Sequence, residues 1–134
     1  MELLFFRGVK LKYPLPNCKI TSGLRANGNP ALYLTDPAGT FSEWKANAIG
    51  GRNEKAVKEY LEKGWSEGLA EADAINLSIK ALLEVVDSGA KNIEVAVIRK
   101  DGTVFISEER LTETIKQIET EKEEAKASAT TVME

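Results

Sequence analysis

The alternation of hydrophobic and polar residues is clearest around one tight turn. Leucines at 32 and 34 face one side while Tyr33 and Thr35 face the other, which predicts a half-buried strand. The sequence Asp-Pro-Ala-Gly at 36–39 predicts a reversal, because proline pre-sets one backbone angle and the aspartate can accept from a nearby backbone N–H. Every second residue from Ser42 to Ala48 then lies on one face of the next strand, and Trp44 is the one large side chain on that face. We therefore predict a β-hairpin anchored by Trp44.

Two helices are predicted after this hairpin. Asn53 can cap the first through its side chain, Gly64 ends it, and Trp65 is expected to pack the following loop onto the core. The second, from about 68 to 88, is apolar over much of its circumference, so we expect neighbours on both sides, and Gly89 supplies its left-handed end. The first helix has an apolar face of Ala56, Val57, Tyr60 and Leu61 and the i,i+4 pairs Glu54–Lys58 and Glu59–Lys63.

The C-terminal third predicts a strand pair and a last helix. Residues 93–98 alternate as a largely buried strand, and Asp-Gly at 101–102 predicts a two-residue hairpin that returns through 103–106. Ser107 can cap the last helix. Beyond about Ala127 the chain is small and polar, which is typical of a disordered tail. The apolar seam of this helix is narrow and consists of Leu111, Ile115 and Ile118.

Composition narrows the class of function. The 134 residues suit one domain, and 43% hydrophobic with 29% charged content is that of an ordinary globular protein. A net charge of −3 without a concentrated basic surface argues against nucleic acid and against an anionic membrane as partners. Cys18 is the single cysteine, which favours a reducing compartment. The apolar start at 3–6 is too short for a signal peptide, and no run reaches the roughly 20 residues of a membrane span.

Candidate chemistry is sparse. The chain has no histidine, so the commonest general base and zinc ligand is absent. Cys18 has no activating neighbour except Lys19, and Gly-Gly-Arg-Asn at 50–53 lacks the ending of a phosphate loop, so a plain strand-to-helix connection is favoured. We predict no catalytic, cofactor-binding or metal site and no small-molecule substrate. Three further features have ordinary structural interpretations. We interpret Glu43 and Lys45 as an exposed ion pair and the charged run 119–126 as a solvated helix face. The triplet Asn76-Leu77-Ser78 matches a glycosylation site but lies inside a predicted helix, so we do not expect it to be glycosylated.

The same motifs resemble a known family. Tyr33 to Gly50, then Arg52-Asn53 and the helix with Glu59-Tyr60-Leu61-Glu62-Lys63, resembles the second half of alpha-type subunits of the 20S proteasome, with Ala38 where the family usually has serine and Gly51 as an apparent insertion. The run from Ala81 to Val97 resembles alpha type-7 subunits, which occupy the fourth position of the alpha ring. The resemblance begins at Asn27 and covers about three-quarters of the chain.

This resemblance implies an α+β fold that forms part of a four-layer αββα sandwich of the Ntn-hydrolase type, with only the C-terminal half present. Residues 1–26 stay unassigned, 27–127 are expected to be that half, and 128–134 the tail. The implied function is a non-catalytic structural subunit of the alpha ring, acting in ubiquitin-dependent protein degradation in cytoplasm and nucleus. Its implied partners are the other alpha subunits of a heteroheptameric ring and the beta subunits.

Two rival interpretations stay open at this point. In one, the chain is a free-standing or truncated α+β interaction module, in which Met1 to Ile20 replaces the absent strands. In the other, it is a threonine hydrolase, although beta-type subunits begin with the nucleophilic threonine and this sequence begins Met1-Glu2-Leu3. The resemblance favours the structural subunit, which would expose apolar faces and strand edges in isolation.

Overall fold

The computed structural model describes residues 3–7, 19–50, 53–85 and 93–131. These residues form two antiparallel three-stranded sheets and a set of helices. Sheet A has the strand order β1-β5-β6, and sheet B has the order β2-β3-β4. The elements are β1 (Leu3–Arg7), β2 (Lys19–Leu24), β3 (Pro30–Thr35), β4 (Phe41–Trp44), α1 (Glu54–Gly64), α2 (Glu71–Leu83), β5 (Glu94–Arg99), β6 (Gly102–Phe105) and α3 (Glu108–Thr131).

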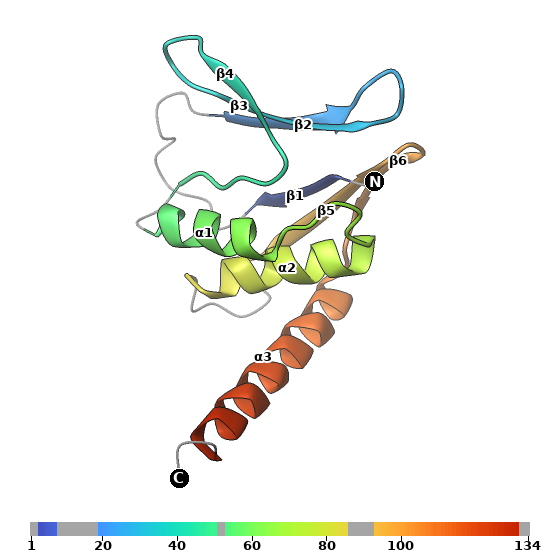
Figure 1. Cartoon of the computed structure of the whole chain (residues 1–134). Coiled ribbons are helices and arrows are strands. Elements are labelled where there is room, and N and C mark those ends of the chain that lie inside the picture. Colours follow the sequence, from blue (N-terminus) through green and yellow to red (C-terminus); the bar gives the residue numbers. More distant parts are fainter. Residues whose placement is uncertain (1–2, 8–18, 51–52, 86–92, 132–134) are drawn as a thin grey trace.

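The elements stack in layers (Figure 1). Sheet B lies over sheet A, with β2 and β3 against β1, and helices α1 and α2 lie on the far side of sheet A. Helix α3 begins beside sheet A and extends away from the body of the molecule. Two sheets and one helical layer are therefore present, in agreement with the mixed, partial sandwich that the sequence predicts.

The predicted hairpin forms the β3–β4 half of sheet B. Tyr33 lies opposite Glu43, and Leu32 lies opposite Trp44. The Asp36 carboxylate accepts a hydrogen bond of 2.9 Å from the Thr40 backbone N–H, so it spans the whole turn. Gly39 has a φ of 84°, a conformation that side chains with a Cβ rarely adopt. Strand β4 ends at Trp44, four residues before the predicted end, and Trp44 is 46% exposed, so it anchors its face less completely than expected.

The tightest core joins sheet A to helices α2 and α3. Val95 and Val97 point from β5 toward these helices, and each is only 1% exposed. Ile79 of α2 is fully buried among them. The predicted seam of α3 is confirmed, because its members are buried in the same cluster: Leu111, Ile115 and Ile118.

A second, smaller apolar cluster holds α1 on α2. Val57 and Leu61 of α1 pack with Ala81 of α2, and Ala46 and Ala48 of the β4–α1 connection pack against them. Gly64 ends α1, as predicted, and a Cβ built there would lie 2.3 Å from a Leu77 methyl carbon. The two helices therefore approach most closely at Gly64.

Several helix ends differ from the prediction. The Asn53 side chain makes no capping hydrogen bond, since it is the Asn53 backbone carbonyl that accepts from Val57. Helix α2 begins at Glu71 and not near 68, and it ends at Leu83, before the predicted end near 88; Gly89 itself lies outside the described residues. Ser107 caps α3 as predicted, by accepting from the Arg110 N–H at 3.4 Å. The helix continues to Thr131, so the expected disorder is wrong for residues 128–131.

The N-terminal segment contributes a strand to each sheet. Strand β1 pairs antiparallel with β5, and β2 pairs antiparallel with β3. Periodicity did not predict β1, because the apolar run 3–6 does not alternate. Strands β4 and β6 remain the outer strands of the described sheets, and both are exposed at every residue. Among the described residues, no further strand pairs with the outer edge of β4 or of β6.

Candidate functional site

A hollow of about 110 Å³ is lined by residues of β3 and β4, of helices α1 and α2, and of the connections beside these elements. Leu32 of β3 and Leu61 of α1, each 8% exposed, are its most buried walls. Two tryptophans, Trp44 and Trp65, line it from the ends of β4 and α1. We call it the tryptophan pocket; its other lining residues are Pro30, Glu43, Lys45, Ala46, Ser66, Leu69, Ala74, Leu77 and Ser78.

The chain builds this pocket from strand alternation and a helix end. Leu32 and Trp44 are cross-strand partners, so they share the face of sheet B that looks toward the helices. The Trp44 indole N–H donates to the Ser42 hydroxyl at 2.6 Å, which satisfies its one polar group. Trp65 follows the last residue of α1, where its backbone N–H donates to the Leu61 carbonyl. The pocket therefore has mostly apolar walls, and the Trp44 indole N–H in it is satisfied.

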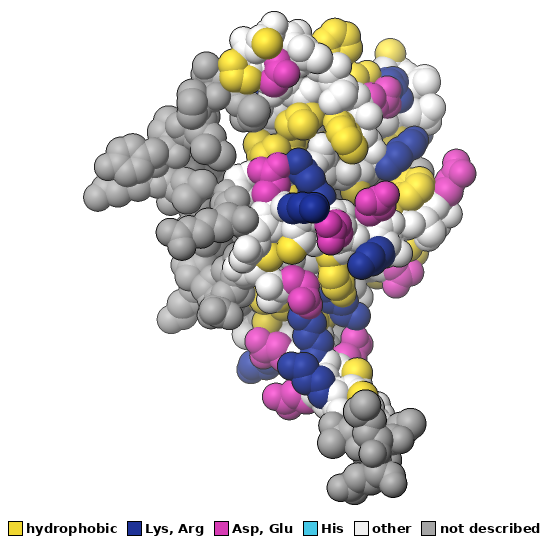
Figure 2. Space-filling model, turned by 60° about the vertical axis from the view of Figure 1, so that its left-hand side comes forward, with side chains coloured by type: hydrophobic (Ala, Val, Ile, Leu, Met, Phe, Trp, Pro, Cys, Tyr) yellow, Lys and Arg dark blue, Asp and Glu magenta, His cyan; other side chains and the backbone are white. Residues whose placement is uncertain are grey.

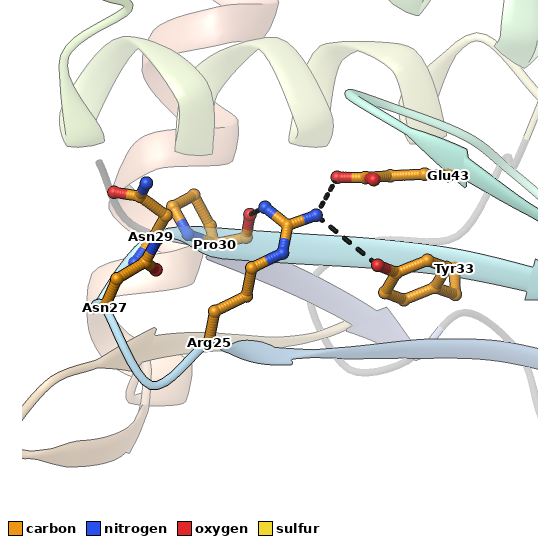
Figure 3. A network of polar contacts seen from close by, with 6 residues as sticks. All are labelled: Arg25, Asn27, Asn29, Pro30, Tyr33 and Glu43. Carbon is orange, nitrogen blue, oxygen red and sulfur yellow. Dashed lines mark hydrogen bonds and ion pairs between the residues drawn. The ribbon is translucent and has the colours of Figure 1, made fainter.

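The opposite face of sheet B carries a polar network (Figure 3). The Arg25 guanidinium forms an ion pair with Glu43, and it also donates to the Tyr33 hydroxyl at 3.4 Å and to the Pro30 carbonyl at 3.5 Å. The Tyr33 hydroxyl and the Glu43 carboxylate raise the pKa of Arg25 above its ordinary value. Phe41, which is 70% exposed, meets the Tyr33 ring edge-on. This network joins the β2–β3 turn to β4.

The network corrects the predicted partner of Glu43. The sequence suggested a pair between Glu43 and Lys45, two residues apart on one strand, but Arg25 takes that carboxylate. Lys45 is exposed and forms no ion pair within the described residues. Both residues also border the tryptophan pocket, although the Glu43 carboxylate is turned to the Arg25 network. The pocket thus has a neutralised carboxylate and an uncompensated ammonium among its polar groups.

The glycine connection after the hairpin is not arranged to bind an external anion. The Gly50 backbone N–H donates to the Glu54 carboxylate at 2.9 Å. Lys58 pairs with the same carboxylate, as the sequence predicted, and Lys58 together with the Gly50 N–H lowers the pKa of Glu54. The protein's own acid therefore occupies the donor that a phosphate would need. Gly51 and Arg52 lie outside the described residues.

The remaining candidates are quickly placed. Cys18 lies outside the described residues, and across those residues no cluster of three or more His, Cys, Asp or Glu could hold a metal ion. Asn76 lies inside α2, while Ser78 of the same triplet lines the tryptophan pocket. A second hollow, at the start of α3, is lined by exposed Ser107, Glu108 and Glu109 together with Thr112. These side chains alone do not assemble a reaction centre.

The charged run at 119–126 is more than a solvated face. Lys80 pairs with Glu121 at 2.8 Å, and Lys122 pairs with Glu84, so two members of the run fasten α3 to α2. Elsewhere on the surface Glu59 pairs with Lys55, at 3.9 Å, and not with the predicted Lys63. Charged and hydrophobic side chains are interspersed on the face drawn in Figure 2. None of the helices in the described part is long and apolar enough to cross a membrane.

Sequence reasoning missed the Arg25 network and the tryptophan pocket. Both depend on contacts between residues far apart in the chain, which periodicity does not reveal. The sequence contains only an indirect sign of the pocket: the two tryptophans lie about twenty residues apart, each next to a predicted helix or strand.

Comparisons with known proteins give a consistent result. The family model described as "Proteasome subunit" matches residues 14–98, more than half of the chain. Proteasome subunit alpha type-8 of Mus musculus is 46% identical over 131 residues, which cover 90% of this chain and 52% of the mouse protein. Proteasome subunit alpha type-7-B of Oryza sativa subsp. indica is 52% identical over 100 residues, covering 74% of this chain and 39% of its own length.

A third relative shows the same partial coverage. Proteasome subunit alpha type-7 of Dictyostelium discoideum is 41% identical over 127 residues, covering 89% of this chain and 50% of the relative. The family match begins at residue 14, earlier than Asn27, where the recognisable motifs start. The chain spans about half the length of the curated relatives that it matches.

Proposed function

Because the chain belongs to the proteasome subunit family, we propose that it is a non-catalytic structural subunit of the alpha ring of the 20S proteasome core. In this role it contributes to ubiquitin-dependent protein degradation by helping to build the chamber. Its partners are the other alpha-type subunits of a seven-membered ring and the beta-type subunits of the adjacent ring. It occupies the fourth ring position and works in both cytoplasm and nucleus.

One observation carries this proposal. Relatives named alpha type-7 or type-8 match most of this chain at 41–52% identity. Identity of this size over 100 to 131 residues favours the same place in an assembly. The run from Ala81 to Val97, which resembles type-7 subunits, supports the fourth position in particular.

Features of the fold support a structural role over a catalytic one. The Glu54 carboxylate, which lies beside the glycine connection, is paired with Lys58 and accepts from the Gly50 N–H, so it is held by its own chain. The outer strands β4 and β6 are exposed, and so are the large side chains Trp44, at 46%, and Phe105, at 70%. Exposed strands with apolar side chains are typical of surfaces that neighbours cover.

Co-expression tests the proposal. The tagged chain is produced together with the six other alpha-type subunits, and the particles are separated by size-exclusion chromatography and native gel electrophoresis. We expect the chain to co-migrate with ring-sized particles and the isolated chain to cleave no peptide substrate. A stable, soluble monomer that stays outside these particles would instead support the free-standing interaction module. Peptide cleavage by the purified chain would contradict the non-catalytic role.

A further inference from the structure

The tryptophan pocket has the size and chemistry of a socket for one side chain. Its volume of about 110 Å³ is somewhat smaller than the roughly 150 Å³ of an apolar cavity that holds benzene. Its walls are mostly aliphatic or aromatic, with Leu32 and Leu61 as the most buried members. A branched aliphatic side chain matches this space, whereas a drug-sized ligand needs about 300 Å³ or more.

The position of Trp44 points to a protein as the source of that side chain. Trp44 is 46% exposed, although its only polar atom is already bonded to Ser42, so its ring presents apolar surface to solvent. Tryptophan is enriched among the residues that dominate the energy of protein interfaces, where it lines or fills desolvated pockets. Covering it therefore stabilises an association without leaving an indole N–H unpaired.

The charges beside the pocket restrict which charge the incoming segment of the partner can carry. Glu43 is neutralised by Arg25, whereas Lys45 is exposed and forms no ion pair within the described residues. An acidic side chain on the incoming segment would complement Lys45, and a basic one would be repelled. The pocket thus favours an aliphatic side chain that has a carboxylate close by.

We propose that the tryptophan pocket receives an aliphatic side chain, flanked by an acidic residue, from a neighbouring subunit of the ring. This inference rests on the proposed function, because it takes the neighbour to be an alpha-type subunit. It adds the residues of the contact: Leu32, Trp44, Leu61, Trp65 and Ser78 form the socket, and Lys45 pairs with the acid.

Filling the pocket tests the proposal. Ser78 lies inside α2 and lines the pocket, so Ser78→Leu adds an isobutyl group where the partner's side chain would bind, in a residue type that helices tolerate well. In the co-expression assay we expect Ser78→Leu to lower incorporation into ring-sized particles at least tenfold. Circular dichroism and the thermal unfolding midpoint of the purified variant establish that it is folded.

Three further variants separate the pocket from general surface effects. Trp44→Ala removes an exposed wall of the pocket and gives a second route to the same loss of incorporation. Phe41→Ala, on the opposite face of the same strand, is the matched control and is expected to stay within twofold of the unchanged chain. Lys45→Glu is expected to lower incorporation severalfold, with a smaller effect at high salt.

The outcomes are distinct. If the unchanged chain does not enter the particles, the proposed function and this inference both fail. If it enters and folded Ser78→Leu and Trp44→Ala enter equally well, the pocket inference alone is overturned. Equal losses for Phe41→Ala and Trp44→Ala would also overturn it, since the contact would then not be specific to the pocket. Benzene binding that Ser78→Leu blocks, with incorporation unchanged, would identify a small-molecule cavity and reject the partner.

Discussion

The central strands β5 and β3 have equivalent places in two antiparallel sheets, yet they are covered very differently. On β5, Val95 and Val97 are 1% exposed beneath α2 and α3. On β3, the most buried residues, Ala31 and Leu32, are each 8% exposed, and the neighbouring β4 is exposed throughout. The central strand of sheet A is covered by helices from its own chain, whereas sheet B is bordered by a pocket and a polar network. The fold thus stores most of its stability around β5 and leaves surface for partners around β4.

The largest expected loss of stability comes from truncating a buried side chain in the core that covers β5. Ile79 is fully buried between sheet A and α3, so Ile79→Ala should reduce the free energy of unfolding by about 4 kcal/mol through lost burial and a residual cavity. Urea unfolding followed by circular dichroism measures this loss. The control is Ile49→Ala in the loop after β4, where Ile49 is 37% exposed and a loss below about 1 kcal/mol is expected. Equal losses would erase the contrast between the two regions.

A pair of substitutions on neighbouring strands sharpens the comparison within sheet A. Val97 and Val104 lie opposite each other on β5 and β6, but Val97 is 1% exposed and Val104 is 44% exposed. Val97→Ala should cost about 2 kcal/mol, and Val104→Ala about 0.5 kcal/mol, because only the first removes fully buried methyl groups. Thermal unfolding of the two variants under identical conditions gives the difference. A larger loss for Val104→Ala would mean that β6 is covered in solution.

The turn that joins β2 and β3 offers a smaller, backbone effect in sheet B. Gly28 has a φ of 80°, and a Cβ there would lie 2.6 Å from the Lys100 side chain in the β5–β6 turn. Gly28→Ala should destabilise the fold by about 1 to 2 kcal/mol, mostly from the left-handed backbone, because the lysine can move aside. Gly23→Ala in β2 meets no atom within 4 Å and should be neutral or slightly stabilising. The denaturant concentrations at the unfolding midpoint measure the two effects. Equal midpoints for Gly28→Ala and Gly23→Ala would contradict a backbone cost at Gly28.

The sequence predicted best what depends on local pattern. The turn at 36–39, the seam from Leu111 to Ile118 and the Ser107 cap follow from spacing and turn chemistry, and the structure confirms them. Strand β1 was missed because its apolar run has no alternation, and its pairing with β5 spans about ninety residues. The division of the chain at residue 26, which left 1–26 unassigned, stays a prediction.

The candidate site was harder to predict than the fold. Arg25 meets Glu43 only after two turns of sheet B have formed, and the tryptophan pocket needs β4 to lie against α1 and α2. Such contacts depend on tertiary packing. The predicted Asn53 cap was wrong for a related reason. The Asn53 side chain makes no capping hydrogen bond, and its backbone carbonyl accepts from the Val57 N–H. The Glu54 carboxylate in the first turn accepts from the Gly50 N–H. Local propensity indicates which residues could form such caps and contacts, and long-range packing determines which of them do.

The smallest expected effect concerns Glu54, at the junction between sheet B and the helices. The pKa of Glu54 is lowered by Lys58 and by the Gly50 N–H, so the ionised carboxylate is more favourable in the folded than in the unfolded chain. Its stabilisation is therefore present above the ordinary pKa of 4.5 and is lost as the pH falls through the lowered folded value. Because the pair is partly exposed, we expect Glu54→Gln to cost only about 0.5 kcal/mol at pH 7.

The pH dependence distinguishes this charge effect from simple loss of packing. Glutamine keeps the shape and can still accept from Gly50, so the difference between the two proteins should shrink toward zero as the pH is lowered to about 3. Urea unfolding at several pH values between 3 and 7 measures that difference. Glu62→Gln, on the exposed side of the same helix and without an ion pair among the described residues, should show no such dependence. A cost for Glu54→Gln that stayed constant across this range would show that the carboxylate acts through its shape and not through its charge.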